Sequence, residues 1–307
     1  MTTLRTALSD YLALRRAMGF RLERAGKLLG QFTGYLDAQH ADTVTTDHAV
    51  AWVSLPAPTS AGWLALRMQA VRGFAAYLHT LDGRHQVPPA GLFPDRPHRA
   101  VPYLYSDDDI NALLAAARRL RHPQRQATYQ TLIGLLIVTG LRIGEAIRLD
   151  DTDIDVGRGM LLVRESKAGK SRLVPLDATT LAALSAYRQL RDAQQPGPRV
   201  PALFVSLAGT RLWYSGVHVT FARLIGLAGL PDRAFARPRI HDLRHSMAVS
   251  TLIGWYRNSE DVQARMPLLS AMLGHAGPRH TYYYLHAAPE LLGLAGQRLQ
   301  TYLEEQP

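Results

Sequence analysis

Cysteine is absent from this chain of 307 residues. Disulfide bonds, thiolate catalysis and cysteine-ligated metal sites are therefore excluded, and a chain without disulfides suits a reducing compartment. Long apolar runs are missing too, because the longest, Leu132 to Val138, is far shorter than the ~20 residues that a membrane-spanning helix needs. The N-terminal residues contain no apolar signal core. We therefore expect a soluble, cytoplasmic protein with no membrane partner.

Lysine is scarce as well. Only three of the 35 Lys and Arg residues are lysines: Lys27, Lys167 and Lys170. Arginine holds phosphate through a fixed fork of donors, but it cannot release a proton near neutral pH. A chain that uses arginine almost everywhere and keeps two lysines within four residues suggests a cation that acts there as an acid. Chance clustering is the alternative.

Acidic residues are outnumbered. The net charge is +10 and the pI is about 10.1. Residues 1–100 carry 11 basic and 7 acidic residues, and the remainder carries 24 and 18, so both halves share the excess. This distribution favours a long polyanion held from two sides, with DNA as the obvious candidate. A solubilising surface charge would give the same numbers.

The chain length favours two domains over one. Residues 1–90 show four segments of helical periodicity with interleaved arginines, which is typical of a small DNA-gripping bundle and equally of a helical bundle with another role. The proline-rich stretch 86–102 indicates an interdomain linker, which we place at residues 91–103. Residues 104–307 then form the second domain.

The second domain is predicted to be mostly helical, so the fold class is mainly α with a small antiparallel β-sheet (α+β). Ser106 and Asp109 form a variant capping box at a helix start, and a buried helix from Tyr129 to Thr139 ends at Gly140. Apolar runs predict three short strands, Met160 to Arg164, Arg172 to Leu176 and Leu203 to Ser206.

Six residues of this second domain suit chemistry at a phosphodiester: Arg142, Lys167, His241, Arg244, His275 and Tyr284. Such a reaction needs cations for the non-bridging oxygens, an acid for the leaving oxygen and a nucleophile. Arg142, oriented by Glu145, and Arg244 can hold both non-bridging oxygens. Lys167, in a predicted hairpin turn, can protonate the leaving oxygen. The hydroxyl of Tyr284 can attack phosphorus.

Several assignments stay open at this point. His241 and Arg244 are spaced to stack one turn apart on a helix, whereas His245 is expected to point elsewhere and to be structural. Lys170 is the rival of Lys167, and either His241 or His275 could accept the phenolic proton. The chain offers no cysteine ligand, and we expect no metal. AGKS lacks the glycine that a phosphate-binding loop needs.

The six residues lie in the segments TGLRIGEAIRL, ESKAGKSRLVPL, HDLRHS, LGH and TYYYLH. Together, in this order, these segments resemble the tyrosine recombinase (phage integrase) family over about residues 104–290, and residues 1–90 resemble it more loosely. The resemblance implies a site-specific DNA recombinase that cleaves and rejoins strands through a covalent 3′-phosphotyrosyl intermediate, without cofactor or metal. All six residues would be catalytic, and the family spacing selects Tyr284 over Tyr282 and Tyr283.

The same resemblance implies partners. The chain would bind double-stranded DNA, assemble as a homotetramer on two recombination sites and act at the bacterial nucleoid. The segments GWYRNSEDVQARMPLLSAMLGH and TYYYLHAAPELL look like those of a transposon- and plasmid-borne subgroup, whose members are often encoded beside sister recombinases, so a sister recombinase is a further implied partner. The tail from Glu290 to Gln306 reads as a helix that packs on its own domain or on a neighbouring protomer.

Two other functions fit the same residues. A type IB topoisomerase uses a similar set and relaxes DNA without two specific sites. A non-catalytic DNA-binding regulator could keep the fold, although it would not need the intact cations and tyrosine.

Overall fold

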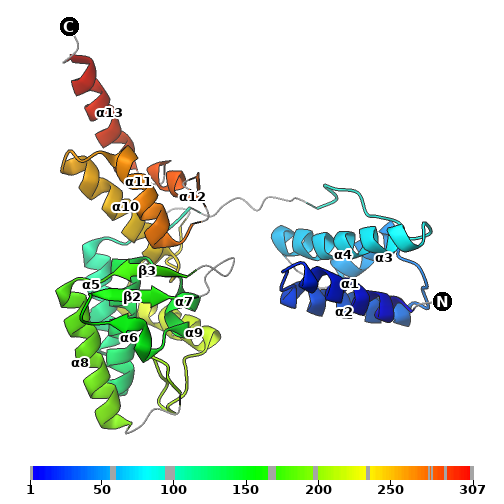
Figure 1. Ribbon diagram of the computed structural model, residues 1–307, viewed down its shortest axis with the longest axis horizontal. Helices are drawn as coiled ribbons and strands as arrows, with labels where there is room; N and C mark the ends of the chain where they lie inside the picture. The colour runs from blue at the N-terminus through cyan, green and yellow to red at the C-terminus, as the bar shows by residue number, and fades with distance from the viewer. Residues whose placement is uncertain are drawn as a thin grey trace. The chain divides into compact units, whose positions relative to one another are not determined.

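A computed structural model describes residues 3–55, 60–93, 101–164, 171–195, 200–232, 236–275, 277, 279–286 and 289–304. The chain divides into two compact units, Met1–Arg99 and Ala100–Pro307. Each unit has its own helices and its own hydrophobic core (Figure 1).

The first unit is a bundle of four helices: α1 (Leu4–Ala17), α2 (Glu23–Ala38), α3 (Thr46–Ser54) and α4 (Ala61–Leu81). Three of them begin with a hydroxyl cap, because the side chains of Thr3, Thr45 and Ser60 accept a hydrogen bond from the backbone three residues on. Large apolar side chains of α2 and α4, including Phe32 and Phe74, are fully buried between the helices. The four helices expected from the periodicity are confirmed.

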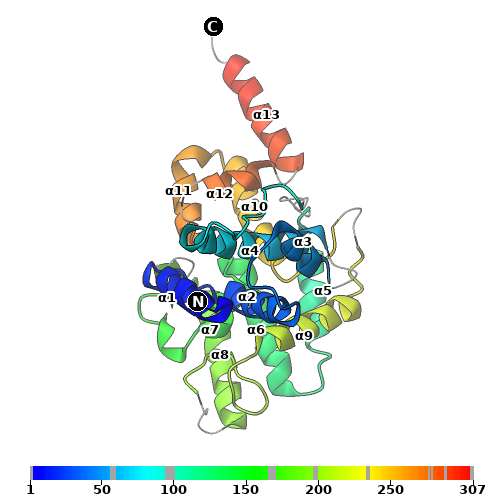
Figure 2. The same cartoon turned by 90° about the vertical axis from the view of Figure 1, so that its right-hand side faces the viewer.

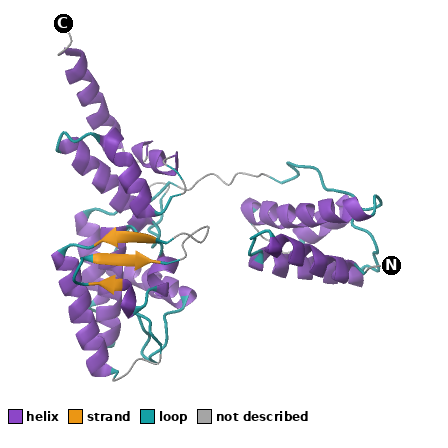
Figure 3. Ribbon diagram, viewed as in Figure 1, coloured by secondary structure: helices purple, strands orange, loops and turns teal. Residues whose placement is uncertain are grey.

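The second unit holds the other elements: α5 (Asp107–Ala117), α6 (Pro123–Thr139), α7 (Ile143–Arg148), η1 (Asp151–Asp153), β1 (Ile154–Asp155), β2 (Met160–Val163), β3 (Arg172–Pro175), α8 (Ala178–Gln194), α9 (Tyr214–Ala228), α10 (Asp242–Arg257), α11 (Val262–Leu273), α12 (Arg279–Tyr282), η3 (Tyr283–His286) and α13 (Pro289–Glu304). The predicted fold class, mainly α with a small antiparallel sheet, is confirmed (Figure 3).

The sheet is antiparallel in the order β1-β2-β3. Leu161 of β2 faces Val174 of β3, and both side chains are buried. The predicted strand from Leu203 to Ser206 is wrong, since the structure has only isolated bridges on either side of Leu203. The physical reason is that side chains replace part of a strand partner: Nη1 of Arg191 donates to the carbonyls of Ala202 and Leu203, and the N–H of Val205 donates to the hydroxyl of Tyr187.

Sequence signals at the helix ends match the structure. Ser106 and Asp109 form the predicted capping box of α5. Helix α6 ends at Gly140, as predicted, but it begins earlier than Tyr129 because Pro123 occupies its first turn, where a missing N–H costs nothing.

A separate apolar cluster of the second unit is built from α10, α11, η3 and the start of α13. Helix α13 contacts α10 and η3 of its own unit, and Figures 1 and 2 show it extending from that end. In the described part of the chain, no helix combines the length and the hydropathy of a membrane span.

Candidate active site

Arg142 lies between two helices whose ends fix its place. Gly140 ends α6 with a φ of +63°, and a Cβ there would lie 2.8 Å from Cδ2 of Leu273, so both the conformation and the close approach require glycine. Two residues on, the backbone N–H of Arg142 donates to Oε2 of Glu145 at 3.0 Å and its Nη1 donates to Oε1 at 2.7 Å. Glu145 therefore orients Arg142, as predicted.

Arg244 is buried in the first turn of α10 with 2% of its surface exposed. Nη1 donates to the carbonyl of Gly140 and Nη2 to that of Leu273, both at 2.6 Å. These carbonyls lie at the C-terminal ends of α6 and α11, where helical carbonyls lack helical partners and carry partial negative charge. Burial, followed by repulsion from Arg142, lowers the pKa of Arg244 to about 10. Arg244 is thus charged at neutral pH and joins three helices.

His275 follows α11 and is hydrogen-bonded to Arg244. Nη2 of Arg244 lies 3.0 Å from Nε2 of His275, and Nδ1 of His275 lies 2.8 Å from Oγ1 of Thr281. Arginine has only donors, so Nε2 accepts and the neutral ring carries its proton on Nδ1, which donates to Thr281. Burial and the charges of Arg244 and Arg142 lower the pKa of His275 to about 4, so the ring is neutral at pH 7.

Tyr284 lies in η3 and is 3% exposed. Its ring stacks on His275, with centroids 6.1 Å apart and an angle of 16° between the planes. Tyr284 and Glu145 act to raise the pKa of Arg244, against the larger effects of burial and Arg142. The tyrosine selected from the sequence therefore lies beside Arg244 and His275.

The two remaining histidines of HDLRHS are arranged differently from the prediction. His241 precedes α10 and is exposed, whereas Arg244 is 2% exposed, and the charge of Arg244 acts on the His241 ring. The expectation that His245 points elsewhere is wrong: its ring centroid lies 5.2 Å from that of His241 and 5.4 Å from that of Tyr284. Positions 241 and 245 are one helical turn apart, which places them on one face.

Both histidines are neutral at pH 7. The pKa of His245 is lowered to about 4, first by burial and then by His241. The pKa of His241 is also lowered, first by burial and then by Arg244. Nδ1 of His245 is buried and has no hydrogen-bond partner among the described residues.

Arg172, the first residue of β3, belongs to the same cluster, although no motif in the sequence analysis selects it. Its Nη1 and Nη2 donate to the two carboxylate oxygens of Glu145. Burial acts to raise the pKa of Glu145, but hydrogen bonds from Arg172 and from the backbone of Arg142, together with their charges, lower it to about 2. Arg142, Arg172 and Arg244 thus surround one carboxylate, and the excess positive charge suits a phosphate.

Lys167 and its rival Lys170 lie outside the described residues, between β2 and β3. The structure therefore brings together Arg142, Arg244, His275 and Tyr284. It leaves His241 at the edge of this group, connected to it through His245.

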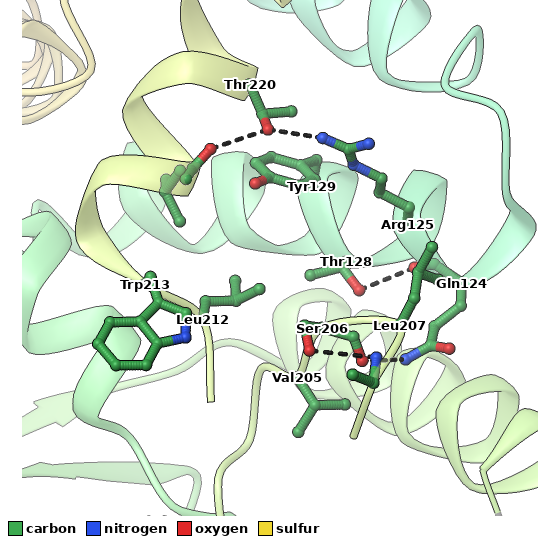
Figure 4. A pocket seen from close by; sticks show the side chains of 13 residues that line it. Gln124, Arg125, Thr128, Tyr129, Val205, Ser206, Leu207, Leu212, Trp213 and Thr220 are labelled. Atoms are coloured by element: carbon green, nitrogen blue, oxygen red, sulfur yellow. Dashed lines mark hydrogen bonds between the residues drawn. The ribbon is translucent and has the colours of Figure 1, made fainter. Parts of the chain in front are cut away.

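The second unit also contains a cavity of about 330 Å³ beside α6 and α9 (Figure 4). It is lined by Tyr129, Val217 and the exposed Trp213, and Arg125 donates across it to Thr220. None of the five predicted residues that the structure describes, Arg142, His241, Arg244, His275 and Tyr284, lines it. The cluster of Arg142, Arg172 and Arg244 is therefore separate from this cavity.

Sequence comparison assigns the chain to a family. The model of the phage integrase family matches residues 104–290. The chain belongs to the phage integrase family.

The integrase is 41% identical to a Sinorhizobium fredii protein named as an integrase/recombinase (y4rB), over 99% of each protein. It is 31% identical to the tyrosine recombinase XerC of Azotobacter vinelandii, over 73% of this chain and 69% of that protein. The predicted activity is therefore confirmed: the integrase is a tyrosine site-specific recombinase, an enzyme that breaks and rejoins DNA strands. These relatives do not favour the topoisomerase or the regulator.

Solved structures share the fold. The Tn1549 transposon integrase in complex with a circular intermediate DNA superposes with a TM-score of 0.66 at 15% identity, covering 97% of this chain and 100% of that one. A lambda integrase tetramer bound to a Holliday junction gives a TM-score of 0.62 at 17% identity, covering 92% and 77%.

Proposed function

We propose that Tyr284 is the nucleophile of this recombinase and that Arg142, Arg244, His241, His275 and Lys167 serve the same scissile phosphate. The single observation that carries the proposal is the stacking of the buried Tyr284 ring on His275, whose Nε2 accepts from Arg244, a guanidinium that the ends of two helices hold in place. In the cleavage step the Tyr284 oxygen forms a bond to phosphorus, and the bond from phosphorus to the 5′ oxygen breaks.

The two arginines would bind the non-bridging oxygens. Each is held by groups other than substrate: Arg142 by Glu145, and Arg244 by helix-end carbonyls. Cations fixed in advance need no rearrangement as negative charge grows on the phosphate, and one such donor contributes about 10²–10³ in rate. Both side chains must stay charged for this role, which the pKa of Arg244, about 10, allows at neutral pH.

The protons have two destinations. Lys167 would donate one to the departing 5′ oxygen, because an alkoxide leaves very slowly without an acid. The phenolic proton needs a base. Nε2 of His275 is already occupied by Arg244, whereas His241 is neutral and at the surface, so we assign the proton acceptor to His241 and the orientation of Arg244 to His275.

The assembly would be a homotetramer on two double-stranded recombination sites, with the first unit as the DNA-gripping domain, residues 91–103 as the linker and a sister recombinase as an additional partner. The fold shared with the lambda integrase tetramer supports this stoichiometry. The net charge of +10, spread over both halves of the chain, supports a grip on DNA from two sides.

The test uses a nicked DNA substrate taken from the ends of the genetic element that encodes the chain. Cleavage next to the nick releases a short fragment, so the covalent protein–DNA adduct cannot religate. We expect an adduct with the wild type and with Tyr282→Phe, a matched control on the exposed neighbour. Tyr284→Phe should give none while binding the DNA as the wild type does. An adduct with Tyr284→Phe would overturn the assignment.

A further inference from the structure

Arg172 connects its own strand to two segments that are far away in the sequence. Its Nε donates to the carbonyl of Met272 at 2.8 Å, its Nη1 to Oε1 of Glu145 at 3.2 Å and its Nη2 to Oε2 of Glu145 at 2.8 Å. The side chain starts from β3, Glu145 lies in α7, and Met272 lies in the last turn of α11. A fork of donors in one plane makes all three bonds at once, which a lysine cannot do.

The carboxylate of Glu145 is fully used by this arrangement. A carboxylate has about four acceptor sites. Oε1 accepts from Nη1 of Arg142 and Nη1 of Arg172, and Oε2 accepts from the backbone N–H of Arg142 and Nη2 of Arg172. Because Arg172 fills two of the four sites, Arg142 makes one side-chain bond to Glu145. Its Nη2 makes no bond to Glu145 and lies 3.5 Å from the carbonyl oxygen of Gly274.

The end of α11 is held in the same way. The carbonyl of Met272 accepts from Arg172 and the carbonyl of Leu273 accepts from Arg244. Adjacent orphan carbonyls of one helix end are thus bound by arginines from β3 and α10. Gly274 follows with a φ of +65°, and a Cβ there would lie 2.6 Å from Nη1 of Arg172. The next residue is His275.

We propose that Arg172 is a positioning residue of the recombinase. It neutralises Glu145 so that Arg142 keeps donors for the phosphate, and it fixes the end of α11 so that His275 meets Arg244. The inference rests on the proposed function, in which Arg142 and His275 act at one phosphate. In this scheme Arg172 acts through Glu145 and the end of α11, to which its Nε, Nη1 and Nη2 each donate a hydrogen bond.

The experiment measures single-turnover cleavage of the nicked substrate by the full chain, with DNA affinity measured separately. Arg172→Met should lower the cleavage rate constant about 10–100-fold, which is typical when a residue that orients the substrate-contacting side chains is lost. Its dissociation constant for DNA should stay within about 3-fold of the wild-type value. Arg172→Lys should restore little, because it keeps the charge but loses the fork. Arg164→Met is the matched control: Arg164 also pairs with a buried carboxylate, that of Asp153, next to the same sheet. It should cleave within about 3-fold of the wild type.

The pH profile separates positioning from mere support of the fold. Glu145 is faced by Arg142 from the start of α7, Arg172 from β3 and Arg244 from α10. Removing Arg172 takes away hydrogen bonds that lower the pKa of Glu145, while burial continues to raise it. The cleavage rate of Arg172→Met should therefore fall as the pH is lowered, at a pH where the wild-type rate is still level. Adding Glu145→Gln to Arg172→Met should remove this fall.

Three results would overturn the inference: wild-type cleavage by Arg172→Met, equal losses in Arg172→Met and Arg164→Met, or a loss that is the same at every pH. If Arg172→Met does not fold, Arg172→Gln, which also removes the charge and the fork, takes its place in both measurements. A wild-type chain that forms no adduct would instead overturn the proposed function.

Discussion

Arg67 of the first unit and Arg244 of the second are both buried, and their surroundings differ. Arg67 of α4 is 5% exposed, donates to the carbonyl of Trp52 at 2.7 Å and lies 3.8 Å from the centre of that residue's indole ring. Arg244 binds two helix-end carbonyls and a histidine, beside a tyrosine. Burial lowers the pKa of both. The difference lies in the neighbours: Arg67 ties α4 to α3, whereas Arg244 lies among other cations, where an anion is stabilised.

The largest expected effect comes from the same substitution at both places. Arg244→Lys should lower the single-turnover cleavage rate by about 10²–10³, because an ammonium cannot hold both carbonyls and the phosphate. Arg67→Lys should cleave at a rate within about 3-fold of the wild-type rate. Rates are measured on the nicked substrate at a temperature where both variants are folded. Similar losses would mean that burial alone, and not the catalytic neighbours, explains Arg244.

A smaller effect on cleavage is expected when the hydrogen bond between His275 and Thr281 is removed. Thr281→Val keeps the shape of a fully buried side chain but removes the acceptor of the Nδ1 proton. A buried donor left unpaired costs about 1–3 kcal/mol, and part of that cost is avoided if the ring turns away from Arg244. We expect cleavage to fall about 10-fold with unchanged DNA affinity. Thr281→Ser, which keeps the hydroxyl, should retain most of the activity, and an equal loss in both variants would contradict the proposed hydrogen bond.

A pair of glycines sharpens the comparison further. Gly274 and Gly229 both end helices with a φ of +65°, but a Cβ at Gly229 meets nothing within 4 Å, whereas one at Gly274 meets the guanidinium of Arg172. Alanine should cost about 1–2 kcal/mol at either site from backbone strain. Gly274→Ala should cost about 1–3 kcal/mol more as hydrogen bonds to Arg172 are lost. Denaturant unfolding measures the loss in the free energy of unfolding of each variant. Equal losses would show that the Arg172 side chain moves aside without cost.

The smallest effect is the decrease in the free energy of unfolding at acid pH. The pKa values of His245 and His275 are about 4 in the folded chain, below the ~6.5 of an unfolded histidine. As the pH falls below about 6.5 the unfolded chain binds protons first, so the free energy of unfolding should decrease down to about pH 4. Unfolding titrations at pH 7 and pH 5 measure this loss, which should be smaller in His245→Asn. An identical pH dependence in that variant would contradict a neutral, buried His245.

Local signals predicted most of the fold. Periodicity gave the four helices of the first unit, and the Ser106–Asp109 box and Gly140 gave two helix ends that the structure has. The failed strand at Leu203 shows the limit of such signals, because a distant side chain, Arg191, satisfies that backbone. Apolar residues alone cannot reveal such a partner.

The site was predictable only where chemistry and order in the sequence coincide. The order of Arg142, Arg244, His275 and Tyr284 identified residues that gather in space. Arg172 could not be found that way, because its partners are 27 and 100 residues away and its strand looks ordinary. The position of His245 was misjudged for a related reason: it depends on where η3 crosses α10, which no local pattern specifies.

The most direct measurement is to locate the DNA on the protein. After trapping on the nicked substrate and digestion with protease and nuclease, mass spectrometry of the TYYYLH peptide identifies which of its three tyrosines carries the nucleotide. The account predicts the modification on Tyr284, the buried tyrosine that stacks on His275. A nucleotide on Tyr282 or Tyr283 would contradict it.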